Sequence, residues 1–271
     1  MTQGFGRARI PAIRERISAM NEKINIRGVS IDNVTMDEAA EAVQSFLKED
    51  GPHAVYTPNA EIIQACIEQP ELSEVINGAE LIIPDGAGVV LASRILGTPL
   101  KGKTPGIELG ERLIALSAET GCRIFFLGGR PQVAELAKEK LLQKYPGAQI
   151  VGTHDGYFQK EGAENDEVIR LVNAAAPDIL FVCFGVPAQE KWIAANRERM
   201  PSVRVFAGLG GSLDGYAGVV KRAPKFFIRC NLEWFYRLIK EPRRIGRMMK
   251  LPKFIGGTVV YRLTGRGRRD A

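Results

Sequence analysis

The chain has 271 residues, of which 45% are hydrophobic and 25% are charged, a composition that permits a large buried core and excludes a disordered or low-complexity protein. Its apolar runs, such as residues 179–185, are of strand length, so none reaches the roughly 18 residues of a membrane-spanning helix, and no secretory signal is evident. The net charge of +6 excludes neither an enzyme nor a binding protein, but it is unevenly distributed.

Basic residues are concentrated near the C-terminus. Residues 220–271 contain fifteen Lys and Arg and three acidic side chains, so this segment carries +12 and the remainder carries −6. Such a segment predicts a polyanionic partner, which can be anionic lipid, phosphate groups or nucleic acid. Trp234, Phe235 and Ile245 are interspersed with the cations at helical spacing, which is typical of an amphipathic helix in a membrane interface. We therefore expect a cytoplasmic protein that is peripheral on the inner face of the cell membrane.

The sequence divides into an N-terminal extension (1–22), an α/β domain (23–220) and a basic amphipathic appendage (221–271). Within the domain, apolar segments alternate with amphipathic ones. The expected strands are residues 24–31, 54–57, 81–84, 123–128, 149–152, 179–185 and 203–208. The expected helices are residues 35–47, 59–77, 87–96, 106–119, 131–145, 166–175 and 187–200, the first of which begins with the capping box Thr35–Glu38.

Most of these strands are continuous apolar runs, as in a parallel sheet covered on both faces. Repeated strand–helix units predict the α/β class, with a doubly wound, mostly parallel Rossmann-like sheet and a basic amphipathic helical appendage at the C-terminus. Ligands of such sheets bind at the carboxyl ends of the strands. The loops that follow the strands are therefore where functional residues are expected.

Two of these loops carry polar side chains directly after a strand. Asp85 follows the strand at 81–84, where a carboxylate could take the proton of a sugar hydroxyl or could cap the next helix. Thr57 and Asn59 lie at the end of the expected strand at 54–57, where both could bind a sugar or Asn59 could cap the next helix. The residues alone leave both alternatives open.

Three further loops carry glycine or polar signals. Gly128 and Gly129 end the strand at 123–128 and could let the backbone approach a phosphate, or could form a simple tight turn. Gln189 lies in a polar cluster after the strand at 179–185. Residues 207–215 contain four glycines, among them Gly211, which suggests close approach of the backbone to a ligand.

Several functional classes have no support in the sequence. The four cysteines lie far apart and only two histidines occur, so we expect reduced thiols and no metal site. There is no P-loop, GxSxG, HExxH or kinase motif, and no Asp-x-Asp pair to hold a divalent metal. A leaving diphosphate would then have to be stabilised by Arg, Lys and helix N-termini.

Six motifs occur in a specific order: TPNAEII, LIIPDGAGVVLASRILGTPL, IFFLGG, HDGYF, FGVPAQEKW and AGLGGSLDGYAG. In this the chain resembles the WecG/TagA/CpsF family, glycosyltransferase family 26, over about residues 24–255. The resemblance implies an inverting, metal-independent enzyme without a cofactor. It implies transfer of an N-acetylmannosamine-type sugar from a UDP donor to polyprenyl-diphosphate-linked N-acetylglucosamine, for teichoic acid or another surface polymer. It also implies self-association, from which we expect a homo-oligomer.

The resemblance also implies roles for individual residues. Asp85 matches the proposed base of the family, and Asp214 falls near the uridine position. Lys103 stands where the family usually has Arg, so it keeps the charge but loses the bidentate fork. Together with the glycines of the loops, the substrate-binding positions are Thr57, Asn59, Lys103, Gln189, Asp214, Gly128, Gly129, Gly211, Arg237, Arg244 and Arg247, the three arginines being assigned to the diphosphate.

Two other functional classes remain as alternatives. An NAD-dependent oxidoreductase is disfavoured because no GxGxxG opens the first strand–helix unit. A protein that binds nucleic acid or anionic lipid without catalysis could use the basic appendage alone. The aromatic residues of the appendage fit a membrane interface at least as well, so we expect no nucleic-acid partner.

Overall fold

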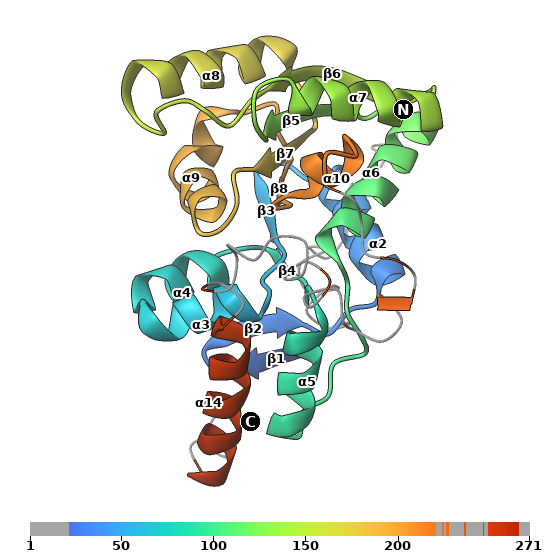
Figure 1. Cartoon of the computed structure of the whole chain (residues 1–271). Coiled ribbons are helices and arrows are strands. Elements are labelled where there is room, and N and C mark those ends of the chain that lie inside the picture. The colour runs from blue at the N-terminus through green and yellow to red at the C-terminus, as the bar shows by residue number, and fades with distance from the viewer. Residues whose placement is uncertain are drawn as a thin grey trace, which may run out of the picture.

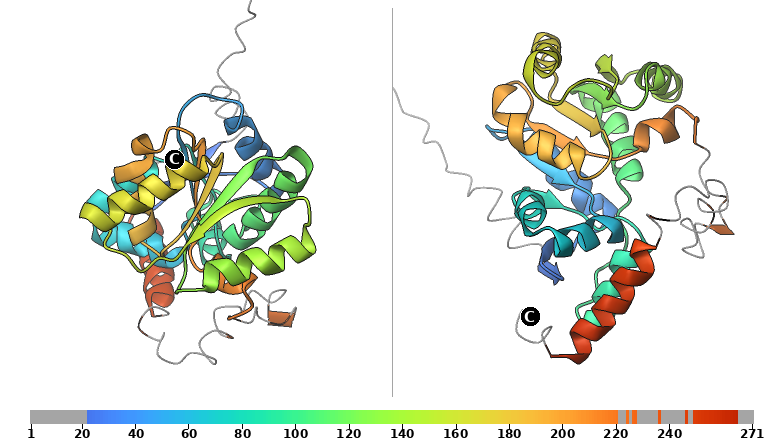
Figure 2. Two further views of the ribbon diagram at one scale, coloured as in Figure 1. Left: turned by 90° about the horizontal axis from the view of Figure 1, so that it is seen from above. Right: turned by 60° about the vertical axis from the view of Figure 1, so that its left-hand side comes forward.

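A six-stranded parallel sheet with helices on both faces forms the body of the protein (Figures 1 and 2). The structure, a computed structural model, describes residues 22–220, 224, 226–227, 236, 246 and 249–265. The strands are β3 (His53–Tyr56), β4 (Leu81–Ile82), β5 (Arg123–Gly128), β6 (Gln149–His154), β7 (Ile179–Cys183) and β8 (Val205–Gly208), in the spatial order β4-β3-β8-β7-β5-β6. The predicted α/β class and mostly parallel sheet are confirmed.

The sheet is buried on both faces, and alternate residues of each strand enter opposite cores. In β7, Leu180 and Val182 join one core, whereas Ile179, Phe181 and Cys183 join the other. This explains why the strands are continuous apolar runs rather than alternating apolar and polar residues.

Helices cover each face of the sheet. One face is covered by α2 (Met36–Phe46), α6 (Gly106–Thr120), α7 (Val133–Lys144) and the short α10 (Ser212–Tyr216). The other face is covered by α3 (Ala60–Glu68), α4 (Pro70–Asn77), α5 (Ala87–Leu96), α8 (Gly162–Ala175), α9 (Ala188–Asn196) and α14 (Lys250–Leu263). A single 3₁₀ turn, η1 (Arg197–Arg199), follows α9.

Two predicted elements differ from the structure. The segment expected as one strand at residues 24–31 is an antiparallel hairpin outside the main sheet, β1 (Lys23–Ile26) and β2 (Val29–Asp32). Its turn residues Arg27 and Gly28 both have positive φ, 56° and 96°, as a two-residue hairpin turn requires. The helix expected over residues 59–77 breaks at Pro70 into α3 and α4, because proline disfavours a helical conformation in the residue before it.

The hairpin and α14 are joined to the body through the same edge of the sheet. The buried Asp32 carboxylate accepts a hydrogen bond from the Ile82 backbone N–H at 2.8 Å, which ties β2 to β4. Helix α14 packs against α3 and α5 with Phe254 and Thr258 fully buried (Figure 1). An ideal Cβ on Gly88 would lie only 2.6 Å from Leu251 Cδ1, so a glycine at the start of α5 lets the start of α14 approach closely.

The capping box of α2 gives a test of local stability. Thr35 Oγ1 accepts from the Glu38 N–H at 3.3 Å, and Glu38 Oε2 accepts from the Thr35 N–H at 2.7 Å. We expect Thr35→Ala to lower the free energy of unfolding by about 1 kcal/mol, because the Glu38 N–H loses its acceptor while the backbone N–H of residue 35 keeps its bond to Glu38 Oε2. Urea unfolding followed by circular dichroism measures the change. Ser45→Ala on the same helix is the control and should change stability by less than about 0.5 kcal/mol; equal losses would contradict the role of the cap.

Candidate functional site

The register of the parallel strands brings the ends of four strands to one level. Tyr56 of β3 and Val182 of β7 both pair with Gly208 of β8, and Cys183 pairs with Gly128 of β5. The loops that follow these strands therefore begin side by side at the carboxyl edge of the sheet. Most of the described residues predicted for the site lie in these loops or in the loop after the neighbouring strand β4.

Thr57 joins the loop after β3 to the end of β8. Its side chain is buried, and its Oγ1 donates a hydrogen bond to the Gly208 carbonyl at 3.0 Å. The first residue of α6, Gly106, packs on it so closely that a Cβ there would lie 3.0 Å from Thr57 Oγ1. The threonine thus fixes the relative position of β3, β8 and α6 at the edge where a substrate would lie.

Asn59 acts as the N-cap of α3. Its Oδ1 accepts hydrogen bonds from the backbone N–H groups of Glu61 at 2.9 Å and Ile62 at 3.1 Å. The capping alternative for this residue is therefore confirmed. Within the described part of the chain no acceptor for its Nδ2 is found, and this half of the amide can serve a ligand without breaking the cap.

Asp85 lies half-buried directly after β4, beside the loop of β3. Its backbone N–H donates to the Pro58 carbonyl at 3.2 Å, which holds the two loops together. The N-cap of α5 is Gly86, with φ 90°, so Asp85 is not the capping residue of that helix. Lys103 is also half-buried and adjoins this segment, because the Thr104 N–H donates to the Pro84 carbonyl at 2.7 Å.

Gln189 lies beneath the glycine loop of β8 rather than on its surface. Its side chain is 1% exposed, its Oε1 accepts from the Gly210 N–H at 2.9 Å, and its Nε2 donates to Glu190 Oε1 at 2.9 Å. Both ends of the amide are therefore used within the protein. Any contribution of Gln189 to substrate binding has to act through the shape of the loop.

Gly128 and Gly129 have a packing reason to be glycine. Gly128 has φ 139°, and a Cβ there would lie 2.4 Å from the Cys183 carbonyl oxygen. The Gly129 N–H donates to the same carbonyl at 3.1 Å, and its own carbonyl accepts from Gly156 at 2.8 Å. The Gly129 amide is thus already engaged, so this turn joins β5, β6 and β7 irrespective of any phosphate.

Two further predicted residues lie at the loop that follows β8. Gly211 is exposed and precedes α10, while Asp214 is half-buried in the first turn of that helix. An ideal Cβ on Gly211 would lie 3.8 Å from the Asp214 carboxylate, so the two positions are adjacent. Arg237, Arg244 and Arg247 lie outside the described residues, and their assignment to the diphosphate stays a prediction.

Two ionisable groups at this edge, the buried Glu190 and the half-buried Lys160, make contacts that the sequence did not predict. Glu190 is fully buried, and desolvation raises its pKa to about 7. The Lys160 ammonium donates to the carbonyls of Gly156 and Phe158 and lies 4.4 Å from the Phe184 ring centroid, which joins the loops after β6 and β7. Desolvation is the main reason why the pKa of Lys160 is lowered. Glu190 lies within the motif FGVPAQEKW, and Lys160 follows the motif HDGYF, but the contacts between the two loops follow only from strand order.

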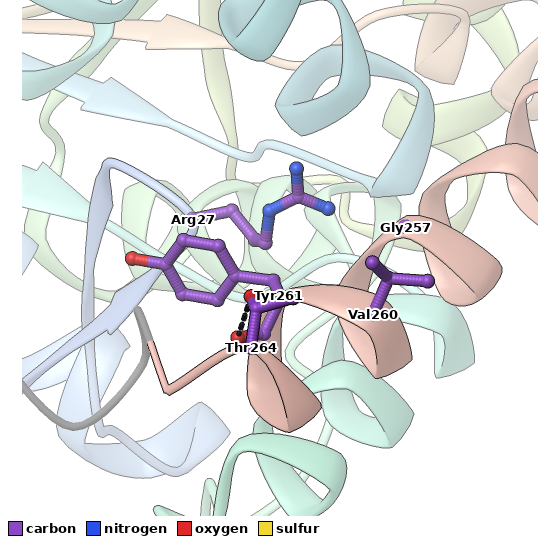
Figure 3. Close-up of a pocket in the computed structure, with 5 residues that line it drawn as sticks. All are labelled: Arg27, Gly257, Val260, Tyr261 and Thr264. Atoms are coloured by element: carbon purple, nitrogen blue, oxygen red, sulfur yellow. Dashed lines mark hydrogen bonds between the residues drawn. The ribbon is translucent and has the colours of Figure 1, made fainter.

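A cavity of about 610 Å³ lies away from this edge, between the β1–β2 turn and the last turns of α14 (Figure 3). It is lined by Arg27, Gly257, Val260, Tyr261 and Thr264. The Arg27 guanidinium stacks over the Tyr261 ring, with Cζ 5.1 Å from its centroid. Among the described residues, no group of three or more His, Cys, Asp or Glu side chains is placed to hold a metal ion.

Burial of Glu190 predicts a pH dependence of stability. The pKa is raised from 4.5 to about 7, so the folded state binds this proton more tightly than the unfolded state. The resulting stabilisation is fully present below about pH 4.5 and is lost as the pH rises through about 7. We expect Glu190→Gln to remove this loss, so the variant gains stability relative to wild type between about pH 5 and about pH 8 in urea unfolding. A difference that stays constant over this range would contradict the assignment.

Comparisons with known proteins identify the family of this chain. The model of the glycosyl transferase WecG/TagA/CpsF family matches residues 24–268. Two proteins of Staphylococcus aureus, from strains MRSA252 and NCTC 8325 / PS 47, are each 36% identical over 235 residues, which is 86% of this chain and 91% of the relative. Both are named N-acetylglucosaminyldiphosphoundecaprenol N-acetyl-beta-D-mannosaminyltransferase. The chain therefore belongs to the WecG/TagA/CpsF family of glycosyl transferases.

Proposed function

We propose that this protein transfers N-acetylmannosamine, or a closely related sugar, from a UDP donor to N-acetylglucosamine that is linked through a diphosphate to a polyprenyl lipid. The observation that carries the proposal is the position of Asp85, a half-buried carboxyl at the carboxyl edge of the sheet, in a chain 36% identical to relatives named for this transfer. The family match also favours this activity over a dehydrogenase, because no observation on the described residues supports a dehydrogenase.

Asp85 is the general base in this proposal. It takes the proton of the acceptor hydroxyl while that oxygen forms a bond to the anomeric carbon of the donor. The bond between the anomeric carbon and the UDP oxygen breaks on the opposite face, and UDP leaves with the bonding electrons. Attack from the opposite face inverts the configuration at that carbon. No step requires a metal ion.

The neighbouring residues orient the substrates. Thr57 and Asn59 lie in the loop after β3, which is hydrogen-bonded to Asp85 through Pro58. The half-buried Lys103 adds a positive charge close by, because its neighbour Thr104 is hydrogen-bonded to Pro84. Gln189 acts through the backbone of Gly210. Asp214 and Gly211 contact the nucleoside part, and Arg237, Arg244 and Arg247 neutralise the diphosphate. Charge on a leaving diphosphate that has no metal has to be met by such cations.

The first experiment measures UDP release. Wild-type protein is given UDP-N-acetylmannosamine and a short-chain polyprenyl-diphosphate N-acetylglucosamine in the presence of EDTA. We expect turnover, and we expect Asp85→Asn to reduce it about a hundredfold or more, because the amide cannot accept the proton. Asp37→Asn, at an exposed position of α2, is the matched control and should retain wild-type turnover.

Each outcome of this experiment bears on a different part of the proposal. Activity with another UDP-sugar only would keep the base and change the donor. Full activity of Asp85→Asn would remove the base from the mechanism. Absence of turnover with every UDP-sugar tested would overturn the transfer itself.

The acceptor is bound to a lipid, and we propose that the surface around α14 contacts an anionic membrane. Val260 and Leu263 are 58% and 80% exposed, and Leu91 of α5, against which α14 packs, is also exposed. Arg27, in the cavity beside Val260, has no acidic partner among the described residues, and burial lowers its pKa. Apolar side chains next to an uncompensated guanidinium fit a lipid headgroup with its acyl chain. No described helix is long and apolar enough to cross a membrane.

Vesicle sedimentation tests this surface. We expect the protein to bind vesicles that contain phosphatidylglycerol and not vesicles of phosphatidylcholine alone. Arg27→Gln should weaken this binding about fivefold, since a basic residue near such a surface contributes about 1 kcal/mol. Lys48→Gln removes an exposed cation that follows α2 and does not line the cavity, and it should have less than about twofold effect. Equal binding to both kinds of vesicle, or equal effects of the two variants, would refute the assignment.

A further inference from the structure

Glu190 is an acidic residue buried at the site, and the proposed mechanism assigns it no role. It lies in the first turn of α9 and is fully buried. Its Oε1 accepts a hydrogen bond from Gln189 Nε2, whereas Oε2 has no partner among the described residues. The Tyr56 hydroxyl donates to the Glu190 backbone carbonyl at 3.2 Å, so this turn also touches β3. Burying a carboxyl with one oxygen unpaired costs stability, and a purely structural role would be filled better by an apolar residue.

The carboxyl of Glu190 determines how the amide of Gln189 is oriented. In the structure Glu190 Oε1 accepts a hydrogen bond from Gln189 Nε2 at 2.9 Å, so the carboxyl holds the NH₂ end of the amide. The carbonyl end then faces the other way, where it accepts from the Gly210 N–H at 2.9 Å. Rotation of the amide by a half turn would place oxygen against oxygen at Glu190 and N–H against N–H at Gly210. The arrangement therefore has one favourable orientation.

Through its N–H, which donates to Gln189 Oε1, Gly210 couples the amide to the loop at the carboxyl edge of the sheet. It has φ 59°, and the loop around it is tied at its start by Thr57, which donates to the Gly208 carbonyl. A Cβ on Gly208 would lie 3.0 Å from Gln189 Nε2, so the loop rests directly on the amide. The loop from Gly208 to Gly211 is consequently held by β3 on one side and by the Gln189–Glu190 pair on the other.

We infer that Glu190 is a positioning residue for the donor: by fixing the Gln189 amide it holds the Gly208–Gly211 backbone in the shape that receives the nucleotide sugar. The inference rests on the proposed function for the identity of the donor, and it acts on binding rather than on the proton transfer at Asp85. Disturbing the pair should therefore raise the KM for the donor and leave the KM for the acceptor unchanged.

An exchange of the two side chains tests the hydrogen bond itself. Gln189→Glu places two carboxyl groups against each other, and we expect the donor KM to rise about tenfold or more. Adding Glu190→Gln restores one donor between the positions, while the residue at 189 still accepts from Gly210. The double variant should return the donor KM to within about threefold of wild type.

Gln64→Glu is the matched control. Gln64 is buried on α3, and its Nε2 donates to the exposed Glu68 Oε1 at 2.9 Å, an amide–carboxylate contact on another element. The substitution also sets two carboxyl groups against each other, but it should leave the donor KM unchanged. A rise in donor KM equal to that of Gln189→Glu would show a general loss of stability and overturn the inference, as would failure of the double variant to recover.

Hydrogen exchange of the peptide that contains Gly208–Gly211 separates this inference from the proposed function. Gln189→Glu should speed exchange of this peptide, and the double variant should restore wild-type protection, whether or not the wild-type protein turns over the UDP-sugar. If the double variant restores wild-type protection of this peptide but the protein does not turn over the UDP-sugar, the positioning role stands and the UDP-sugar is rejected as the donor. Unchanged exchange in Gln189→Glu would overturn the positioning role even in an active enzyme.

Discussion

The parallel register of β3, β8, β7 and β5 is the constraint on which the site depends. Because these strands run in the same direction and end at the same level, four loops that are far apart in sequence begin at one edge. The antiparallel hairpin β1–β2 contributes nothing to that edge and instead extends the molecule below β4 (Figure 1). Because the strands run in one direction, short motifs that are far apart in the sequence lie together at the carboxyl edge of the sheet.

Close packing of backbone against backbone accompanies this register. Gly128 has to approach the Cys183 carbonyl, and Gly106 has to approach Thr57, at distances that leave no room for a Cβ without displacement. Packing alone therefore requires glycine at these two positions, whether or not a ligand binds there. The same crowding excludes water from Gln189 and Glu190, which makes their mutual hydrogen bond decisive for the conformation of the neighbouring loop.

The C-terminal helix α14 connects this edge to the opposite end of the molecule. Its first turn meets Gly88, three residues after Asp85, and its last turns border the cavity at Arg27. A helix in this position can contact a lipid surface with its exposed side while its start lies close to Asp85, the proposed base. Such an arrangement suits an enzyme whose acceptor carries its own membrane anchor.

The sequence by itself determined the α/β class, most elements, the capping box at Thr35 and the edge at which Asp85, Thr57 and Asn59 lie, because apolar period and strand–helix alternation are local properties. It did not determine that residues 24–31 fold back as a hairpin, since their apolar residues suit either a sheet strand or a hairpin until Arg27 and Gly28 adopt positive φ.

Tertiary structure alone decided the burial of Gln189 and Glu190 and the contact of Arg27 with Tyr261. A polar run after a strand looks the same in sequence whether it faces solvent or lies beneath a glycine loop. The difference arises from the adjacency of β7 and β8, and from the position of α14 beside the hairpin. Both are packing relations between segments distant in sequence, and no local pattern encodes them.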